Sequence, residues 1–145
     1  MPRSLLLAAL AAALLLPPAA HAQNGEDAAI RAAVQHYLQG HATGDGAHHA
    51  RVFHPASMLY WMRDGALQQR TSAEYIAGAR GRPADDEAQR TRRIALIDVT
   101  GDAAVVKVEL DYPGALITDY FSMLKVDGEW KILNKIFHVA PKEDG

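Results

Sequence analysis

The chain has no cysteine among its 145 residues. Disulfide bridges, thiol nucleophiles and cysteine metal ligands are therefore excluded, and packing alone must stabilise the fold. The chain also has no run of five basic residues, because the arginines between Arg80 and Arg93 alternate with Asp85, Asp86 and Glu87. A basic patch of the kind that binds nucleic acid is missing, so we expect no nucleic-acid partner.

Several catalytic motifs are missing too. The sequence contains no G-x-S-x-G elbow, no phosphate-binding glycine loop and no H-E-x-x-H motif. This argues against nucleophilic hydrolysis and nucleotide chemistry. Histidines are frequent between His36 and His54, but His36 and His41 are five residues apart and so do not share a helix face. We expect neither a metal nor a cofactor.

No apolar run is long enough to cross a membrane. The longest, Leu5 to Leu16, has about a dozen residues, and a spanning helix needs roughly 20. It follows Arg3 and precedes a Pro17-Pro18 break and the small-residue sequence Ala20-His21-Ala22, which is typical of a signal-peptidase site. The sequence therefore predicts a secretory signal peptide over residues 1–22 and a single periplasmic or secreted domain over 23–145, with no membrane anchor after cleavage.

The first half of this domain has helical periodicity. Ile30, Val34, Tyr37 and Leu38 recur at steps of three and four and predict a helix over residues 26–41. A short second helix over 47–53 ends before Pro55, and the capping-box pattern that begins at Thr71 predicts a third helix over 72–79.

Strand patterns fill the rest of the domain. A short hairpin turns at Asp64-Gly65, and four longer strands are separated by glycine-containing turns; the predicted strands are 57–63, 66–70, 92–99, 103–112, 116–126 and 129–139. The fold class is therefore α+β, with three N-terminal helices and a short hairpin packed on a curved antiparallel sheet.

These elements, together with Tyr37-Leu38, Thr43-Gly44-Asp45, Phe53-His54-Pro55 and the segment from Asp119 to Phe137, resemble the nuclear transport factor 2-like superfamily. Within it the chain is most similar to the putative lumazine-binding (SnoaL-like) families. The resemblance implies a cone-shaped fold around a cavity, and a homodimer formed through the sheet. Some relatives perform acid/base chemistry in the cone and others bind ligands, so the fold leaves the function open.

The last strand supplies the first candidate site residues. Strict alternation places Trp130, Ile132, Asn134, Ile136 and His138 on one face, and this more apolar face is expected to point inward. Asn134 and His138 are then the polar groups of an apolar cavity.

The position of Asp119 depends on the turn at Asp127-Gly128, and two registers are open. A two-residue turn places Asp119 on the face of Asn134 and His138, which would form an acid/base cluster. A three-residue turn places it opposite Lys135 in a surface ion pair and places Tyr120 opposite Asn134.

Two functions of different kinds are consistent with these residues. In the first, the domain binds a small, largely apolar ligand, oriented by Asn134, His138 and a tyrosine among Tyr37, Tyr60 and Tyr120. In the second, it is an isomerase, dehydratase or cyclase with Asp119 as base and His138 or Tyr60 as acid. The second hypothesis requires that Asp119 face neither solvent nor Lys135. The sequence does not decide whether the protein is an enzyme.

Overall fold

Helices come first along the chain and strands follow. The computed structural model describes residues 18–143. The helices are α1 (Pro18–Thr43), α2 (Gly46–Val52), α3 (Ser72–Ala77) and a short 3-10 helix, η1 (Glu87–Gln89). The strands are β1 (Phe53–Arg63), β2 (Ala66–Thr71), β3 (Thr91–Thr100), β4 (Ala103–Tyr112), β5 (Ala115–Val126) and β6 (Glu129–Pro141). The predicted α+β class is confirmed, with η1 as an additional element.

The N-terminal part differs from the prediction. Helix α1 begins at Pro18, whereas the apolar periodicity predicts a start at Glu26. Residues 1–17, which include Arg3 and the apolar run, lie outside the described residues, so export stays a prediction. No helix in the described part of the chain is both long and apolar enough to span a membrane.

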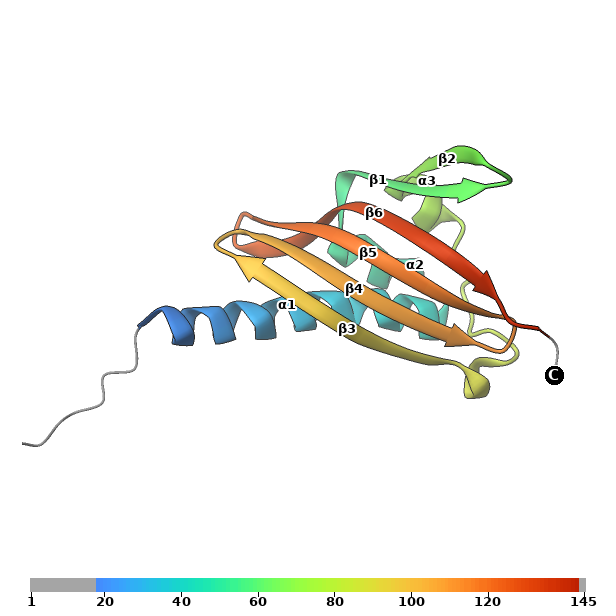
Figure 1. Cartoon of the computed structure of the whole chain (residues 1–145), viewed down its shortest axis with the longest axis horizontal. Helices are drawn as coiled ribbons and strands as arrows, with labels where there is room; N and C mark the ends of the chain where they lie inside the picture. Colours follow the sequence, from blue (N-terminus) through green and yellow to red (C-terminus); the bar gives the residue numbers. More distant parts are fainter. Residues whose placement is uncertain (1–17, 144–145) are drawn as a thin grey trace, which may run out of the picture.

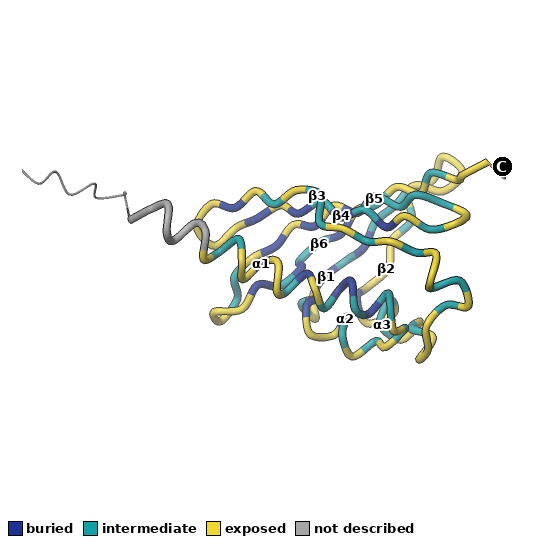
Figure 2. Tube along the Cα trace, turned by 90° about the horizontal axis from the view of Figure 1, so that it is seen from below, coloured by how far each residue is buried: buried dark blue, intermediate teal, exposed yellow. Residues whose placement is uncertain are grey.

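All six strands belong to one sheet, in the order β2-β1-β6-β5-β4-β3. Neighbouring strands are antiparallel except β1 and β6, which pair in parallel. Helix α1 passes behind β3 and β4 in Figure 1, and all three α-helices lie on the same side of the sheet in Figure 2. The inner face is thereby covered, while the outer face is open to solvent.

The core lies between α1 and the inner face. Ile30, Val34 and Tyr37 on α1 have no exposed surface, and they pack with alternate residues of the sheet such as Val108 and Phe121. Each such aliphatic or aromatic side chain contributes roughly 1.5–3 kcal/mol on burial. Residues three or four apart on α1 lie on one face of the helix, and residues two apart on each strand lie on one face of the sheet. These two faces pack against each other.

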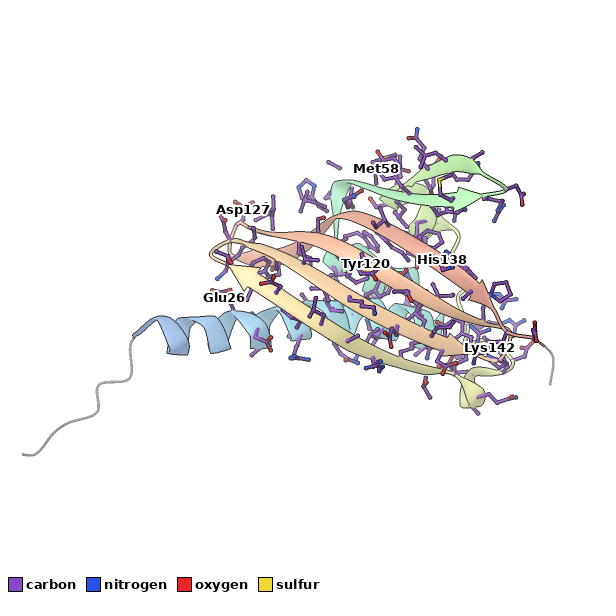
Figure 3. All side chains as sticks on the ribbon, viewed as in Figure 1. Glu26, Met58, Tyr120, Asp127, His138 and Lys142 are labelled. Atoms are coloured by element: carbon purple, nitrogen blue, oxygen red, sulfur yellow. The ribbon has the colours of Figure 1, made fainter. Side chains whose placement is uncertain are left out.

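The turn at Asp127-Gly128 has two residues, as in the first of the two predicted registers. Asp127 and Gly128 have φ angles of 51° and 83°, and Val126 pairs with Glu129 across the turn. Positive φ at both positions is what a type I′ hairpin requires. Figure 3 labels Asp127 at this end of the sheet, where Lys125 of the same hairpin forms an ion pair with Glu26 of α1.

A β-bulge in β6 then changes the register. Met123 pairs with Ile132 and Ser122 with Asn134, so Leu133 has no partner on β5. Beyond the bulge Asp119 lies opposite Phe137, which neither predicted register anticipates. One unpaired residue reverses which side chains face inward.

The predicted inward orientation of Asn134 and His138 is therefore wrong. Before the bulge Trp130 and Ile132 are buried, as expected, but after it Lys135 is buried and His138 is exposed. Asn134 is half-buried on the outer side of the sheet. The bulge at Leu133 is the physical reason, because an alternation argument assumes a regular strand.

Candidate functional site

Three polar side chains form a charged cluster between α1 and the sheet: Tyr37, Asp119 and Lys135. Tyr37 Oη donates a hydrogen bond of 2.6 Å to Asp119 Oδ2 and accepts one of 2.5 Å from Lys135 Nζ. Lys135 Nζ also lies 2.9 Å from Asp119 Oδ1. Tyr37 and Asp119 are fully buried and Lys135 is 4% exposed.

The fold builds this cluster from three elements. Tyr37 belongs to the buried stripe of α1, and Asp119 occupies an inward position on β5. Because Asp119 pairs with Phe137, it is the diagonal neighbour of Lys135 on the same face of the sheet. Sequence reasoning considered the Asp119–Lys135 pair only as a surface contact, and the structure buries it.

Burial controls the ionisation of the cluster. The pKa of Lys135 is lowered, chiefly by desolvation, and the charge of Asp119 opposes this effect only in part. The pKa of Tyr37 is raised well above its ordinary value by burial and by the neighbouring carboxylate. Tyr37 is therefore a neutral donor, and the Lys135 ammonium loses its proton more readily than an exposed lysine.

Aromatic rings complete the surroundings of Lys135. Its Nζ lies 5.0 Å from the ring centroid of Tyr37, 5.2 Å from that of Tyr75 and 4.8 Å from that of Phe137. These ring faces attract a cation. They also keep water away from the amine.

Buried ion pairs are weak evidence for a stabilising role. The desolvation of two charges commonly offsets their attraction, and apolar replacements of such pairs are often as stable. Ionisable groups whose pKa values are shifted and that lie at a cavity are, in contrast, typical of functional sites. The charged cluster is therefore the candidate functional site.

Lys135 lines an inner cavity of about 600 Å³. Most of the wall is apolar and includes Leu59, Leu110, Ile117 and Phe137. His41 and Tyr75 are polar lining residues, and the exposed Arg63, Asp64 and Arg70 extend the lining to the β1–β2 hairpin. A small apolar molecule with one or two polar atoms matches this distribution of lining groups.

A hydrogen-bonded chain reaches this cavity from the η1 side. Glu87 accepts two bonds, of 2.6 and 2.8 Å, from Arg92, and Arg92 Nε donates to Tyr112 Oη at 3.1 Å. His41 lies between two phenols, with Nδ1 at 3.3 Å from Tyr112 Oη and Nε2 at 2.9 Å from Tyr75 Oη. The chain holds both the imidazole and the Tyr75 hydroxyl in place.

His41 and Tyr75 are both uncharged at neutral pH. The pKa of His41 is well below its ordinary value, chiefly because of desolvation and secondly because of the nearby charge of Lys135. Burial raises the pKa of Tyr75. The cavity thus presents a neutral imidazole, a neutral phenol and an amine to any molecule inside it.

The other residues expected at the site lie on the opposite face of the sheet. Tyr60, Tyr120 and His138 line an outer groove of about 360 Å³ together with exposed apolar side chains such as Met62 and Leu67. Figure 3 labels Tyr120 on β5 and His138 on β6. Asp119 is on the inner face, so it forms no acid/base pair with His138 or Tyr60. The requirement that Asp119 not face Lys135 also fails.

Sequence reasoning therefore identified Tyr37 and Asp119 but missed Lys135 and Tyr75, and treated His41 only as a helix-face and metal candidate. The burial of Lys135 follows from the bulge, which leaves no recognisable pattern in the sequence. Tyr75 lies in the helix that the Thr71 capping box starts, and the structure confirms that capping box. Among residues 18–143 no three His, Asp or Glu side chains converge as metal ligands.

The fold defines the class of protein. A protein described as NTF-2 like and of unknown function from Silicibacter pomeroyi DSS-3 is 26% identical, with a TM-score of 0.71 over 81% of this chain and 98% of that chain. An NTF2-like protein of unknown function from Shewanella baltica OS155 is 25% identical, with a TM-score of 0.74 over 82% of this chain and 97% of that chain. The predicted NTF2-like resemblance is confirmed.

The family follows from the sequence match. The model of the putative lumazine-binding family matches residues 25–138, and the chain belongs to that family. A protein named Aldolase FrzH, from Cladobotryum sp, is 28% identical over 126 residues, which cover 86% of this chain and 99% of that protein.

Proposed function

We propose that the protein is an enzyme that binds a small, largely apolar carbonyl compound in the inner cavity and catalyses carbon–carbon bond chemistry next to the carbonyl group, as in an aldol reaction. The observation that carries this proposal is the buried amine of Lys135, held by Tyr37 and Asp119 at a mainly apolar cavity wall. The name of the 28% identical relative, an aldolase, supports the same reaction class.

The lining groups match the needs of such a reaction. A carbonyl oxygen that gains negative charge is stabilised by fixed donors in a water-poor site, and each donor is worth about 10²–10³ in rate. Lys135 and Tyr75 are the two donors of the inner cavity whose surroundings hold them in place. His41 is neutral, and an N–H at its Nε2 donates to Tyr75 Oη, which leaves the Tyr75 hydroxyl proton available for the carbonyl oxygen.

Asp119 has a different role from the general base expected from the sequence. Its carboxylate is occupied by Tyr37 and Lys135. Asp119 therefore holds the Lys135 amine in position and balances its positive charge. The isomerase, dehydratase or cyclase hypothesis that uses Asp119 with His138 or Tyr60 is not retained.

Proton exchange tests the proposal directly. Butanone, cyclohexanone and benzaldehyde, with cyclohexanol as the matched alcohol, are added to the protein in D₂O, and exchange of the protons beside the carbonyl is followed by NMR for the two ketones. We expect exchange above the buffer rate, thermal stabilisation by carbonyl compounds rather than by the alcohol, and about a 100-fold loss of exchange in Tyr75→Phe. Tyr60→Phe, on the outer face, is the matched control and keeps full exchange.

Two results would contradict this function. If the carbonyl compounds neither bind better than cyclohexanol nor exchange protons, carbonyl chemistry in the cavity is refuted. If the carbonyl compounds bind to the wild-type protein but their protons do not exchange, the protein binds apolar ligands without catalysis, as the first sequence-based hypothesis held.

We also propose that the domain is exported and that it forms a homodimer through the outer face of its sheet. The predicted signal peptide supports export, and N-terminal sequencing of the secreted protein should begin at Gln23. Exposed apolar side chains support the dimer; they include Met62, Leu67, Val105, Tyr120, Leu124 and Ile136. Ile136→Asp should convert the dimer to a monomer in light scattering, and a monomeric wild type would refute this interface.

A further inference from the structure

Within residues 18–143, hydrogen bonds to the protein do not use all the N–H bonds of the Lys135 amine. An ammonium group has three N–H bonds. Tyr37 Oη at 2.5 Å accepts one of them, Asp119 Oδ1 at 2.9 Å is the paired anion, and Lys135 also lines the inner cavity. A carbonyl compound in the cavity therefore meets the nitrogen from the side that the protein leaves open.

A proton acceptor for the amine is already in place. Asp119 Oδ1 is fully buried, and no donor in the described part of the chain is aligned to form a hydrogen bond with it. Lys135 Nζ, 2.9 Å away, is the cation paired with it. Burial lowers the pKa of Lys135, so its amine gives up a proton more readily than that of an exposed lysine, and Oδ1 is the carboxylate oxygen within reach to receive that proton.

We infer that Lys135 is a nucleophile that forms a covalent imine with an aldehyde or ketone bound in the inner cavity. This inference rests on the proposed function and adds to it the covalent step and the substrate class. Amines held in desolvated surroundings are the usual nucleophiles toward carbonyl carbons.

The step balances with groups that are present. Asp119 takes one proton from Nζ, the free nitrogen pair bonds to the carbonyl carbon, and Asp119 returns this proton to the former carbonyl oxygen, which becomes a hydroxyl group. A second proton then passes from the nitrogen to the hydroxyl by the same route, and the C–O bond breaks to release water as the nitrogen pair forms the C=N bond. The product is a protonated imine, whose positive charge lies beside the Asp119 carboxylate as the ammonium charge did. One lysine ammonium and one carbonyl compound thus give one iminium ion and one water, with no oxidant or reductant.

Reductive trapping tests the inference. The wild-type protein is incubated at pH 6.5 with benzaldehyde or butanone and sodium cyanoborohydride, which reduces the imine to a stable amine. We expect one adduct whose mass increase equals that of the probe less one oxygen atom, and peptide mapping should place it on Lys135. The exposed or half-exposed lysines Lys107, Lys125, Lys131 and Lys142 are internal controls, because they do not line the inner cavity.

Variants separate the amine from its charge. Lys135→Arg keeps a cation but has no nucleophilic amine, so it should lose both the adduct and proton exchange. Lys131→Met, which removes a lysine from the same strand outside the cavity, should retain both. The assignment of Lys135 as the nucleophile would be refuted by an adduct spread over the exposed lysines or by the absence of any adduct. Full proton exchange in Lys135→Arg would refute it as well.

The two proposals can fail separately. Exchange without a Lys135 adduct would leave the proposed function standing and eliminate the covalent step. An adduct on Lys135 without exchange would establish the imine and eliminate the proposed carbon–carbon chemistry.

Discussion

Replacement of Lys135 by methionine should destabilise the protein strongly. The change leaves the Asp119 carboxylate fully buried with one hydrogen bond, from Tyr37, and without its cation. Removal of one partner of a buried ion pair costs about 3–5 kcal/mol. A domain of this size has a free energy of unfolding of about 5–15 kcal/mol, so the loss should be a large fraction of the total stability.

Removal of the whole cluster should restore that stability. The triple variant Tyr37→Phe/Asp119→Leu/Lys135→Met has neither a charge nor a hydroxyl group left at the three positions of the cluster. Apolar replacement of a buried ion pair is neutral or stabilising by about 1–4 kcal/mol. The triple variant should therefore unfold at a urea concentration equal to or above that of the wild type, and show neither proton exchange nor the imine adduct.

Urea titration monitored by tryptophan fluorescence and circular dichroism gives the stability of both variants. The midpoint reports stability, and an unchanged slope shows that the surface exposed on unfolding is the same. Lys131→Met is the control from an exposed position. If Lys135→Met lies within about 0.5 kcal/mol of the wild type, the pair is not desolvated and the argument from burial is refuted.

Three further predictions concern the groups around the cluster. Tyr75→Phe should reduce proton exchange about 100-fold and lower stability by only about 1 kcal/mol, because the ring stays while the hydroxyl, which also hydrogen-bonds His41 Nε2, is lost; equal activity would refute the role of the hydroxyl. Gly40→Ala should destabilise by about 1–3 kcal/mol although alanine favours helices, because its Cβ would lie 2.4 Å from His49 Nε2, and His49→Ala should rescue part of this loss. Stability should fall as the pH is lowered from about 6.5 to 4, because burial lowers the pKa of His49 to about 4 and the unfolded chain binds a proton that the folded chain excludes. Above pH 7 this dependence should vanish, and His49→Phe should reduce the slope of urea midpoint against pH, with the remaining slope due to His41.

The elements of the fold were accessible from local patterns. The apolar stripe through Ile30, Val34 and Tyr37 predicted the first long helix, and period-two alternation with glycine turns predicted all six strands. Such patterns work because a helix or strand that buries one face must repeat its apolar residues at the period of its backbone. The two-residue turn at Asp127-Gly128 was likewise one of the registers that its residue types allowed.

The candidate site was accessible only in part. Tyr37 and Asp119 were singled out, but Asn134 and His138 were placed on the wrong face, and Lys135 on the surface. An alternation argument carries no information about an unpaired residue, and Leu133 is such a residue. The same error placed His138 in the expected cavity, whereas it lines the outer groove together with Tyr60 and Tyr120.

The sequence alone determined the class of the protein: where its helices and strands lie, and that they form an α+β domain of the NTF2-like type. Tertiary structure decided which lysine is buried and which carboxylate pairs with it. The reason is that β6 lies between β5 and the parallel strand β1, and the pairings with both partners shift around the bulge. A contact among strands far apart in the chain thus turns Lys135 toward Asp119 and Tyr37, and local residue preferences do not encode that choice.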